Sequence, residues 1–328
     1  MKALSSLLSC SLIAVSILST APALAQDPAA NYPSKPITLI IPYLPGSTSE
    51  RLSHVFKDGL SQEFKQPMIL DYKPGASGII GNQHVIRNGA DGHTVAFAAA
   101  TVAILPAFNK DIPYDLLRDM SPVSLMIRDV YVLIIPADFP AATFEEYIAY
   151  ARANPGKINW GTVGAGGALH LGGEWLAHAM GVKFTMVHYK GSSTAEIDLM
   201  AGRIQGTPKG MASAIPLIKS GKTRVLAILQ SQRTPVLPGV RSVAEMGAPD
   251  YEYPSWIGIL GAGTAPPAVI SKLSAALARG VKSPKSMQTW DTLGVMPVGS
   301  TPDEFRRILG REITHWKKFI EDNNIKGE

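Results

Sequence analysis

The sequence has almost no cysteine. Its single cysteine, Cys10, lies in an N-terminal segment with the character of a cleaved leader, so the rest of the chain has none. This excludes disulfides, thiolate metal sites and a cysteine nucleophile in the mature protein. An exported chain without disulfides must be stabilised by a large core, and about 300 residues are ample for two lobes.

Charged residues are also scarce, at 17% of the chain against 46% apolar residues, which indicates a globular rather than a disordered protein. The charges are scattered, and lysine and arginine form no run interleaved with aromatic residues. Nucleic acid is therefore not an expected partner. The formal net charge of +5 gives a mild positive field, which helps gather anionic ligands but cannot select among them.

One hydrophobic run stands out, and it lies at the N-terminus. An apolar stretch over residues 7–18 is followed by Pro22 and by small residues at 23–25. This pattern predicts a cleaved secretory signal peptide over residues 1–25 and a protein exported to the periplasm. Lipoprotein processing at Cys10 is the alternative, but it would leave almost no hydrophobic region upstream. No later segment resembles a transmembrane span.

Apolar, β-branched segments alternate with amphipathic ones along the rest of the chain, which predicts an α/β protein with mostly parallel sheets. The last of these strands is expected to return to the first sheet. The predicted strands are Ile37–Ile41, Met68–Tyr72, Thr94–Ala98, Val132–Ile135, Lys157–Thr162, Phe184–Tyr189, Arg224–Leu229 and Trp256–Leu260.

Two helix starts carry capping boxes, in which a threonine hydroxyl and a glutamate three residues later satisfy backbone amides reciprocally. They are Thr143 with Glu146, and Thr301 with Glu304. After the second box, apolar residues at helical spacing predict a long C-terminal helix with one buried stripe. The stripe is formed by Phe305, Ile308, Leu309, Ile313, Trp316 and Ile320.

A loop rich in hydroxyls follows the first predicted strand. Gly46 allows a tight turn, and Ser47, Thr48 and Ser49 lead into a helix that Ser49 can cap. Free amides, a positive dipole end and hydroxyls together suit an incoming carboxylate. A capped turn that binds nothing is the alternative interpretation of this loop taken alone.

A second loop of the same character opens a helix after the strand that ends near Thr162. Glycines at positions 161, 164, 166 and 167 let its backbone approach a ligand closely. The loop is not a dinucleotide fingerprint, because Leu169 stands where the third glycine is required. Two such loops, one in each lobe, predict an anion that is held from both sides.

His170, in the second loop, has no cysteine, paired glutamate or second histidine at metal spacing. We interpret it as a structural or hydrogen-bonding histidine. The chain also lacks a GxSxG elbow, an HExxH zinc helix and a complete Walker A loop, and residues 75–81 fit a phosphate loop and an ordinary turn equally well. No catalytic residue, metal or cofactor is expected. The alternative is a hydrolase or isomerase that uses His170 with Glu174, which shares its helix face.

Several further short sequence motifs occur in a fixed order along almost the whole mature chain. In this order they resemble the substrate-binding receptors of tripartite tricarboxylate transporters, the Bug-type family of periplasmic proteins. Besides the first loop, they are residues 32–37 (YPSKPI), 74–78 (PGASG), 91–94 (DGHT), 154–159 (NPGKIN), 189–192 (YKGS), 221–222 (GK) and 297–305 (PVGSTPDEF).

The resemblance implies the periplasmic binding protein, or Venus-flytrap, fold, with two α/β lobes joined by crossing strands. Residues 32–130 and 254–328 would form the first lobe, and residues 131–253 the second. The implied partners are a small carboxylate ligand and the membrane subunits of a tripartite tricarboxylate transporter. Presentation of the ligand to a membrane sensor kinase uses the same fold and stays open as an alternative.

The resemblance also carries ligand-binding positions onto this chain. Both loops would hold a carboxylate of the ligand, and a residue after the third strand would line the same space. The positions are Tyr43, Ser47, Thr48 and Ser49 in the first loop, Thr162, Gly166, Gly167 and His170 in the second, and Thr101.

Three departures from the family pattern bear on the ligand. Ser47 and Glu50 replace a glycine and an aspartate of the first loop, and Gly166–Gly167 replaces a Gly-Thr pair in the second. Lys209 stands where an acidic residue is common. A cation there suits a second carboxylate, so we expect a dicarboxylate, aromatic or not, with Lys209 on its distal group. A solvated loop lysine is the alternative.

Overall fold

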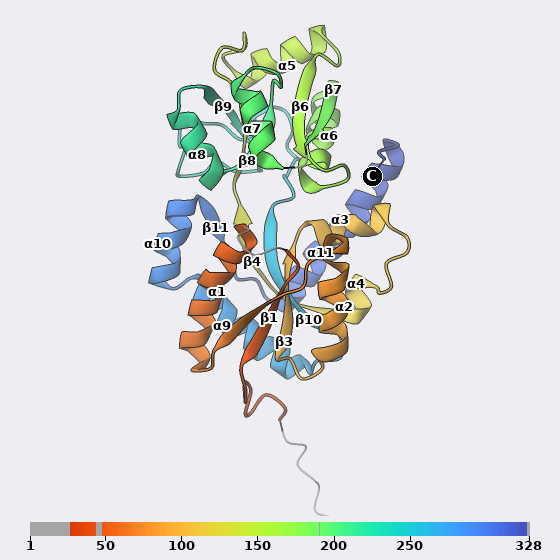
Figure 1. Cartoon of the computed structure of the whole chain (residues 1–328), viewed down its shortest axis with the longest axis vertical. Coiled ribbons are helices and arrows are strands. Elements are labelled where there is room, and N and C mark those ends of the chain that lie inside the picture. Colours follow the sequence, from red (N-terminus) through yellow and green to blue (C-terminus); the bar gives the residue numbers. More distant parts are fainter. Residues whose placement is uncertain (1–26, 44–47, 190, 327–328) are drawn as a thin grey trace, which may run out of the picture.

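The computed structural model describes residues 27–43, 48–189 and 191–326, and the side chains at 48–51 are not among the features described. The predicted leader and Ser47 therefore lie outside the described residues. The chain forms two lobes stacked along its longest axis (Figure 1). In the described ranges no helix is long and apolar enough to cross a membrane.

The first lobe is built on a six-stranded sheet of order β11-β4-β10-β3-β1-β2. β1, β2 and β3 run parallel, whereas β10 is antiparallel to both β3 and β4, and β11 is antiparallel to β4. The strands are β1 (Ile37–Ile41), β2 (Met68–Tyr72), β3 (Thr94–Ala99), β4 (Met120–Asp129), β10 (Trp256–Ala262) and β11 (Val295–Pro297).

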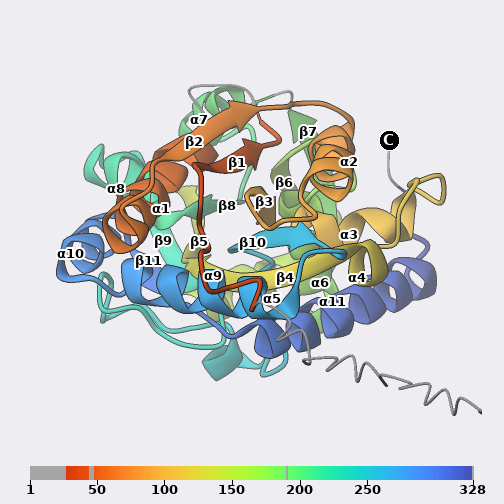
Figure 2. The ribbon, with the colours of Figure 1, turned by 90° about the horizontal axis from the view of Figure 1, so that it is seen from below.

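Helices cover both faces of this sheet, so its inner strands are buried almost continuously along their length. Leu39 and Phe97 point to the face covered by α1, α9 and α10, and Ile40 and Ala96 to the opposite face. α9 and α11 both pack against β4 (Figure 2). The helices are α1 (Thr48–Phe64), α2 (Ile79–Asn88), α3 (Thr101–Phe108), α4 (Leu116–Asp119), α9 (Pro267–Val281), α10 (Pro284–Leu293) and α11 (Pro302–Asp322).

The second lobe has an antiparallel β8-β5-β9 sheet and a parallel β6-β7 pair. A parallel bridge between Trp160 and Gly206 places β6 beside β8, so the strands form one layer. The strands are β5 (Tyr131–Pro136), β6 (Ile158–Val163), β7 (Phe184–Tyr189), β8 (Thr207–Gly210) and β9 (Thr223–Ile228). The helices are α5 (Phe144–Ala153), α6 (Ala168–Met180), α7 (Ser192–Met200) and α8 (Met211–Lys219).

The structure confirms the eight predicted strands to within about two residues, both capping boxes and the long C-terminal helix. The last predicted strand does return to the first sheet. The expectation of mostly parallel sheets is wrong. β4, β8 and β11 were not predicted, because they carry prolines and polar residues, and with β5 and β10 they introduce antiparallel pairs.

Two segments cross between the lobes, and the amide of Gln230 joins them. Gln230 is 3% exposed; its oxygen accepts a hydrogen bond from Tyr131 N (3.0 Å), and its nitrogen donates to Asp129 O and Ser255 Oγ (3.2 Å each). Ser255 Oγ also donates to Asp129 O at 2.7 Å. The first crossing segment, at 129–131, is thus tied to Gln230, which follows β9, and to Ser255 of the second crossing segment, at 252–255, which leads into β10.

Asp129, a half-buried residue, places its carboxyl group at the same crossing. The Asp129 side chain packs against Gly210, where a Cβ would lie 2.8 Å from Asp129 Oδ2. Burial raises the pKa of Asp129 to about 7, and the hydrogen bond from the Val130 amide only partly opposes this. The folded protein therefore holds a proton on Asp129 more tightly than the unfolded chain does.

Replacing Gln230 with leucine should lower the free energy of unfolding by about 1–3 kcal/mol, because it strands buried backbone groups without a partner. Urea unfolding measures the loss. The matched control is Gln232→Leu, whose side chain is exposed and should change stability by less than about 0.5 kcal/mol. Equal effects of the two substitutions would show that the Gln230 amide does not hold the crossing segments.

Asp129 should make stability depend on pH. Because its folded pKa lies above its unfolded value, its contribution is complete below about pH 4 and is lost as pH rises through about 7. Asp129→Asn should therefore gain stability relative to the parent protein between those pH values. Urea unfolding at pH 5 and pH 8 measures the difference, with the exposed Asp138→Asn as control. The assignment fails if both variants show the same pH profile as the parent.

Candidate functional site

The carboxyl ends of the parallel strands in both lobes lie toward the crossing segments. In the first lobe β3 ends beside the start of β10, and β4 ends at the crossing itself. In the second lobe β6, β7 and β8 run parallel, and β8 ends where β5 begins. The two carboxyl edges therefore lie on either side of the crossing segments (Figure 1). Open α/β sheets bind ligands at this edge.

Tyr43 is the residue of the first predicted loop whose side chain is described. It follows β1, and its ring packs edge-on against Phe97 with centroids 6.0 Å apart. Burial raises the pKa of Tyr131, and the nearby Asp129 and Tyr43 raise it further. Because Tyr131 begins β5 at the crossing, Tyr43 also lies near the crossing. Tyr131 in turn stacks on Tyr253, with ring centroids 4.4 Å apart. Thr48 and Ser49 begin α1, but their side chains, like Ser47, lie outside the described features.

Thr101 is the first residue of α3, directly after β3. One turn later, Ile104 belongs to the same buried cluster as Leu171 of α6, and Ala168 packs against that cluster. The cluster also contains Trp316, Phe319 and Ile320 of α11, so the first turns of α3 and α6 are joined across the two lobes through the end of that helix. This arrangement brings the predicted Thr101 and His170 positions to the same side of the interlobe region.

The loop that precedes α6 is held by its own histidine. The amide of Gly166 donates to His170 Nδ1 at 2.9 Å, and Gly164 and Gly166 adopt positive φ angles of 73° and 74°. Since Nδ1 accepts, the ring proton resides on Nε2, which lies 3.5 Å from Glu174 Oε1. This is the geometry of a hydrogen-bonding histidine that shapes the loop. This histidine occupies the Gly166 amide, which the sequence led us to expect would be available to a ligand.

Gly167 is the N-cap of α6, with no side-chain hydrogen bond to the first turn. The departure from the family's Gly-Thr pair therefore leaves the start of this helix without a hydroxyl cap. Backbone amides at such a terminus favour an anion. Gly167 and the loop before it keep the predicted character of a carboxylate-binding turn.

His188, on β7, was missed from the sequence. Its Nδ1 lies 2.8 Å from Thr162 Oγ1, and its ring meets that of His170 edge-on, with centroids 4.8 Å apart. Thr162 and His188 are paired residues of the parallel β6–β7 ladder. The sequence predicts both strands but not their register, so nothing in it joins these two side chains.

Lys209 is buried, at 6% exposed, and forms an ion pair with Glu196 of α7. The alternative of a solvated loop lysine is therefore wrong. Lys209 lies near the carboxyl end of β8, the strand beside β6, so it stands at the same edge as Thr162. The sequence did not reveal Glu196 as its partner, because α7 reaches β8 only in the folded lobe.

The geometry gives little support to covalent chemistry. His170 Nε2 does face Glu174, as the hydrolase or isomerase alternative requires, but Nδ1 is engaged by the Gly166 amide, and Thr162, whose hydroxyl lies beside His188, is only 1% exposed. Across the described ranges, no three His, Cys, Asp or Glu side chains group in a way that could hold a metal ion.

Comparison with known proteins agrees with this architecture. The family model described as the tripartite tricarboxylate transporter family receptor matches residues 52–325. Protein BugT of Bordetella pertussis is 30% identical over 312 residues, which make up 94% of this chain and 95% of BugT.

Solved structures give the same picture. A periplasmic transporter is 34% identical, with a TM-score of 0.77 over 90% of this chain and 99% of that chain. A protein of R. palustris solved with adipate is 28% identical, with a TM-score of 0.77 over the same shares. The fold is that of periplasmic binding proteins, and the chain belongs to the receptor family of tripartite tricarboxylate transporters, the Bug-type solute-binding proteins.

Proposed function

We propose that this protein is a periplasmic receptor that binds a small dicarboxylate reversibly and delivers it to the membrane subunits of a tripartite tricarboxylate transporter. The main support is the position of the two carboxyl edges on either side of the crossing segments, with Tyr43 and Thr101 on one side and the loop before α6 on the other. The family supports the transport role.

The proposed site is strong enough for a receptor without a metal or a covalent step. Micromolar binding corresponds to about −8 kcal/mol. A helix terminus contributes up to about 2 kcal/mol, and each hydrogen bond to a charged group about 1.5–3 kcal/mol. Several such interactions from two loops reach the required value after the entropic cost of binding. Reversible capture without turnover is therefore the function we assign.

The preference for two carboxylates rests on Lys209. A buried cation needs an anionic partner, and Glu196 provides one in this structure. A ligand whose distal carboxylate reaches Lys209 would share that cation with Glu196, whereas a monocarboxylate would not. The R. palustris relative solved with adipate, a dicarboxylate, supports the same ligand class.

The periplasmic location is part of the proposal. It is supported by the predicted signal peptide and by the periplasmic relatives in the same family. Delivery to a transporter is favoured over presentation to a sensor kinase because the matching family is one of transporter receptors.

A thermal-shift screen of the signal-free protein should single out a dicarboxylate. The panel would contain adipate, malate, citrate, terephthalate and the monocarboxylate hexanoate. A ligand present at 100 times its Kd stabilises the native state by about 2.7 kcal/mol and must raise Tm in a concentration-dependent way. The ligand should be recovered unchanged after incubation. If no carboxylate raises Tm, or if the bound carboxylate is converted, the receptor function is wrong.

Lys209→Met should weaken binding of the dicarboxylate by about tenfold or more, which is about 1.4 kcal/mol, while affecting a monocarboxylate of equal length much less. Methionine keeps the apolar stem and removes the charge. Glu196→Gln should keep or strengthen dicarboxylate binding, because it frees the cation. Calorimetric titration measures both.

The control for this pair is Lys222→Met, which removes an exposed charge from the same lobe. Circular dichroism establishes that each variant is folded. A Lys209→Met protein that is folded and discriminates adipate from hexanoate as well as the parent would place Lys209 outside the site.

A further inference from the structure

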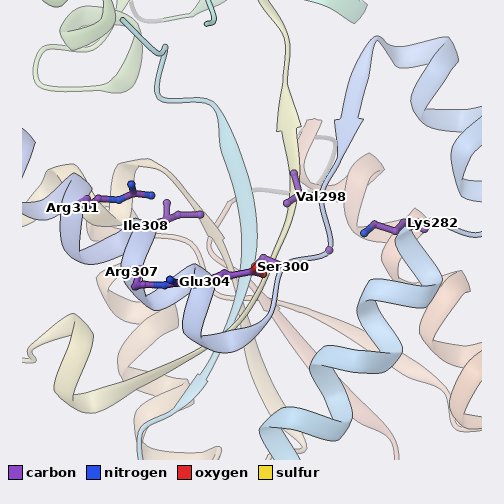
Figure 3. A pocket seen from close by; sticks show the side chains of 8 residues that line it. Lys282, Val298, Ser300, Glu304, Arg307, Ile308 and Arg311 are labelled. Atoms are coloured by element: carbon purple, nitrogen blue, oxygen red, sulfur yellow. The ribbon is translucent and has the colours of Figure 1, made fainter. Parts of the chain in front are cut away.

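A basic hollow lies on the first lobe, away from the proposed ligand site. Its volume is about 720 Å³, and it is bounded by α11, the end of α9 and the segment 298–300 between β11 and α11. Figure 3 shows Arg307 and Arg311 of α11 on one side of that segment and Lys282, at the end of α9, on the other. Val298 and Ile308 supply apolar contact between them.

In the part of the chain that the structure describes, Glu304 is the one acid in the lining of this hollow, and it forms no salt bridge with any of the three cations. Among the described residues, the side chains of Lys282 and Arg311 have no ion pair or hydrogen bond, and the side chain of Arg307 donates only to Asp303 O, at 3.4 Å. The Glu304 carboxylate accepts the Thr301 amide at 2.8 Å. That hydrogen bond, with help from Arg307 and Lys282, lowers the pKa of Glu304. The hollow therefore carries an excess of two positive charges.

The floor of the hollow does not suit a small ion. The amides of Val298 and Gly299 both donate to Met126 O, at 2.9 and 3.3 Å, and that of Ser300 donates to Leu125 O at 3.0 Å. No backbone donor of this segment is left to cradle an anion. Because the cations stand on opposite sides of the segment, an extended acidic chain can reach all three, whereas a compact ion cannot.

The hollow continues toward the second lobe. Ile308 and Arg311 also line a cavity of about 300 Å³ whose other wall includes Trp175 of α6 and Glu252 of the second crossing segment. Val298 also lines a cavity of about 390 Å³ together with Gln230. These adjoining cavities add Asp250, Glu252 and Glu312 but only one further arginine, Arg128, so the positive charge is confined to the hollow.

We propose that this basic groove, the hollow bounded by Lys282, Arg307 and Arg311, is the docking surface for an acidic periplasmic segment of the transporter's membrane subunit. The inference rests on the proposed transport function. Charge complementarity around Lys282, Arg307 and Arg311 would attract the segment, and the groove along α11 would orient it. An anionic membrane surface is the less favoured occupant, because these cations line a hollow that a flat surface cannot enter.

Docking of the full receptor onto its membrane subunits in nanodiscs tests the proposal, with binding followed by biolayer interferometry in the presence of adipate. The variant is Lys282→Glu/Arg307→Glu/Arg311→Glu. It should dock at least about tenfold more weakly than the parent protein. The parent's affinity should fall with added salt more steeply than the variant's, because charge pairs are screened.

The matched control is Lys157→Glu/Lys183→Glu/Lys219→Glu, which makes the same change in net charge at exposed lysines of the second lobe. It should dock like the parent protein. Equal docking by the groove variant, or equal loss by the control, would overturn the proposal. The proposal would also be overturned if the groove variant lost binding to protein-free phosphatidylglycerol vesicles as much as it lost docking, since lipid would then be the occupant.

A thermal-shift titration with adipate is run on the same proteins. Both triple variants should keep the parent's ligand response, because neither touches the proposed ligand site. If the parent itself responds to no carboxylate, the proposed function fails. If it responds and the groove variant still docks normally, the docking surface alone is wrong.

Discussion

The hydrogen bonds of the Gln230 amide hold the two crossing segments together, and the rest of the molecule is arranged around them. They tie the end of β4 to the start of β5 and to Ser255, just before β10. Because both segments meet the sheets at their carboxyl edges, the loops after β1, β3 and β6 must lie near the crossing. The position of the proposed ligand site is thus a consequence of connectivity, and the loops supply only its chemistry.

The second loop is held in its conformation by contacts with the helix that follows it. His170 comes from the first turn of α6 and accepts the Gly166 amide, so the helix itself fixes the loop that leads into it. Thr162 and His188 lie at the same edge, and the ring of His188 packs against that of His170. A loop held in this way loses little conformational entropy when a ligand arrives, which leaves more of the interaction energy for affinity.

Much of this fold can be predicted from the sequence, because a buried strand or helix leaves a pattern of apolar residues within a short stretch of the chain. Ile37–Ile41 is apolar throughout since both faces of its sheet are covered, and Thr301 with Glu304 marks a helix start within four residues. β4 could not be predicted, since Pro122 and Arg128 interrupt its pattern. The Thr162–His188 contact and the burial of Lys209 depend on strand register and on how α7 packs, which no local pattern encodes.

The cations of the chain occupy two environments, and the difference in hydration separates their roles. Lys209 is buried and compensated by Glu196, so a ligand carboxylate can bind it only from a position that shares the cation with Glu196. In the proposed site, this requirement would discriminate between ligands by geometry. Lys282, Arg307 and Arg311 are exposed, so in the proposed docking they would act over longer range and mainly raise the rate of encounter. A receptor that must select a small ligand and then find a large partner needs both kinds of charge, kept apart on the molecule so that a change in one does not alter the other.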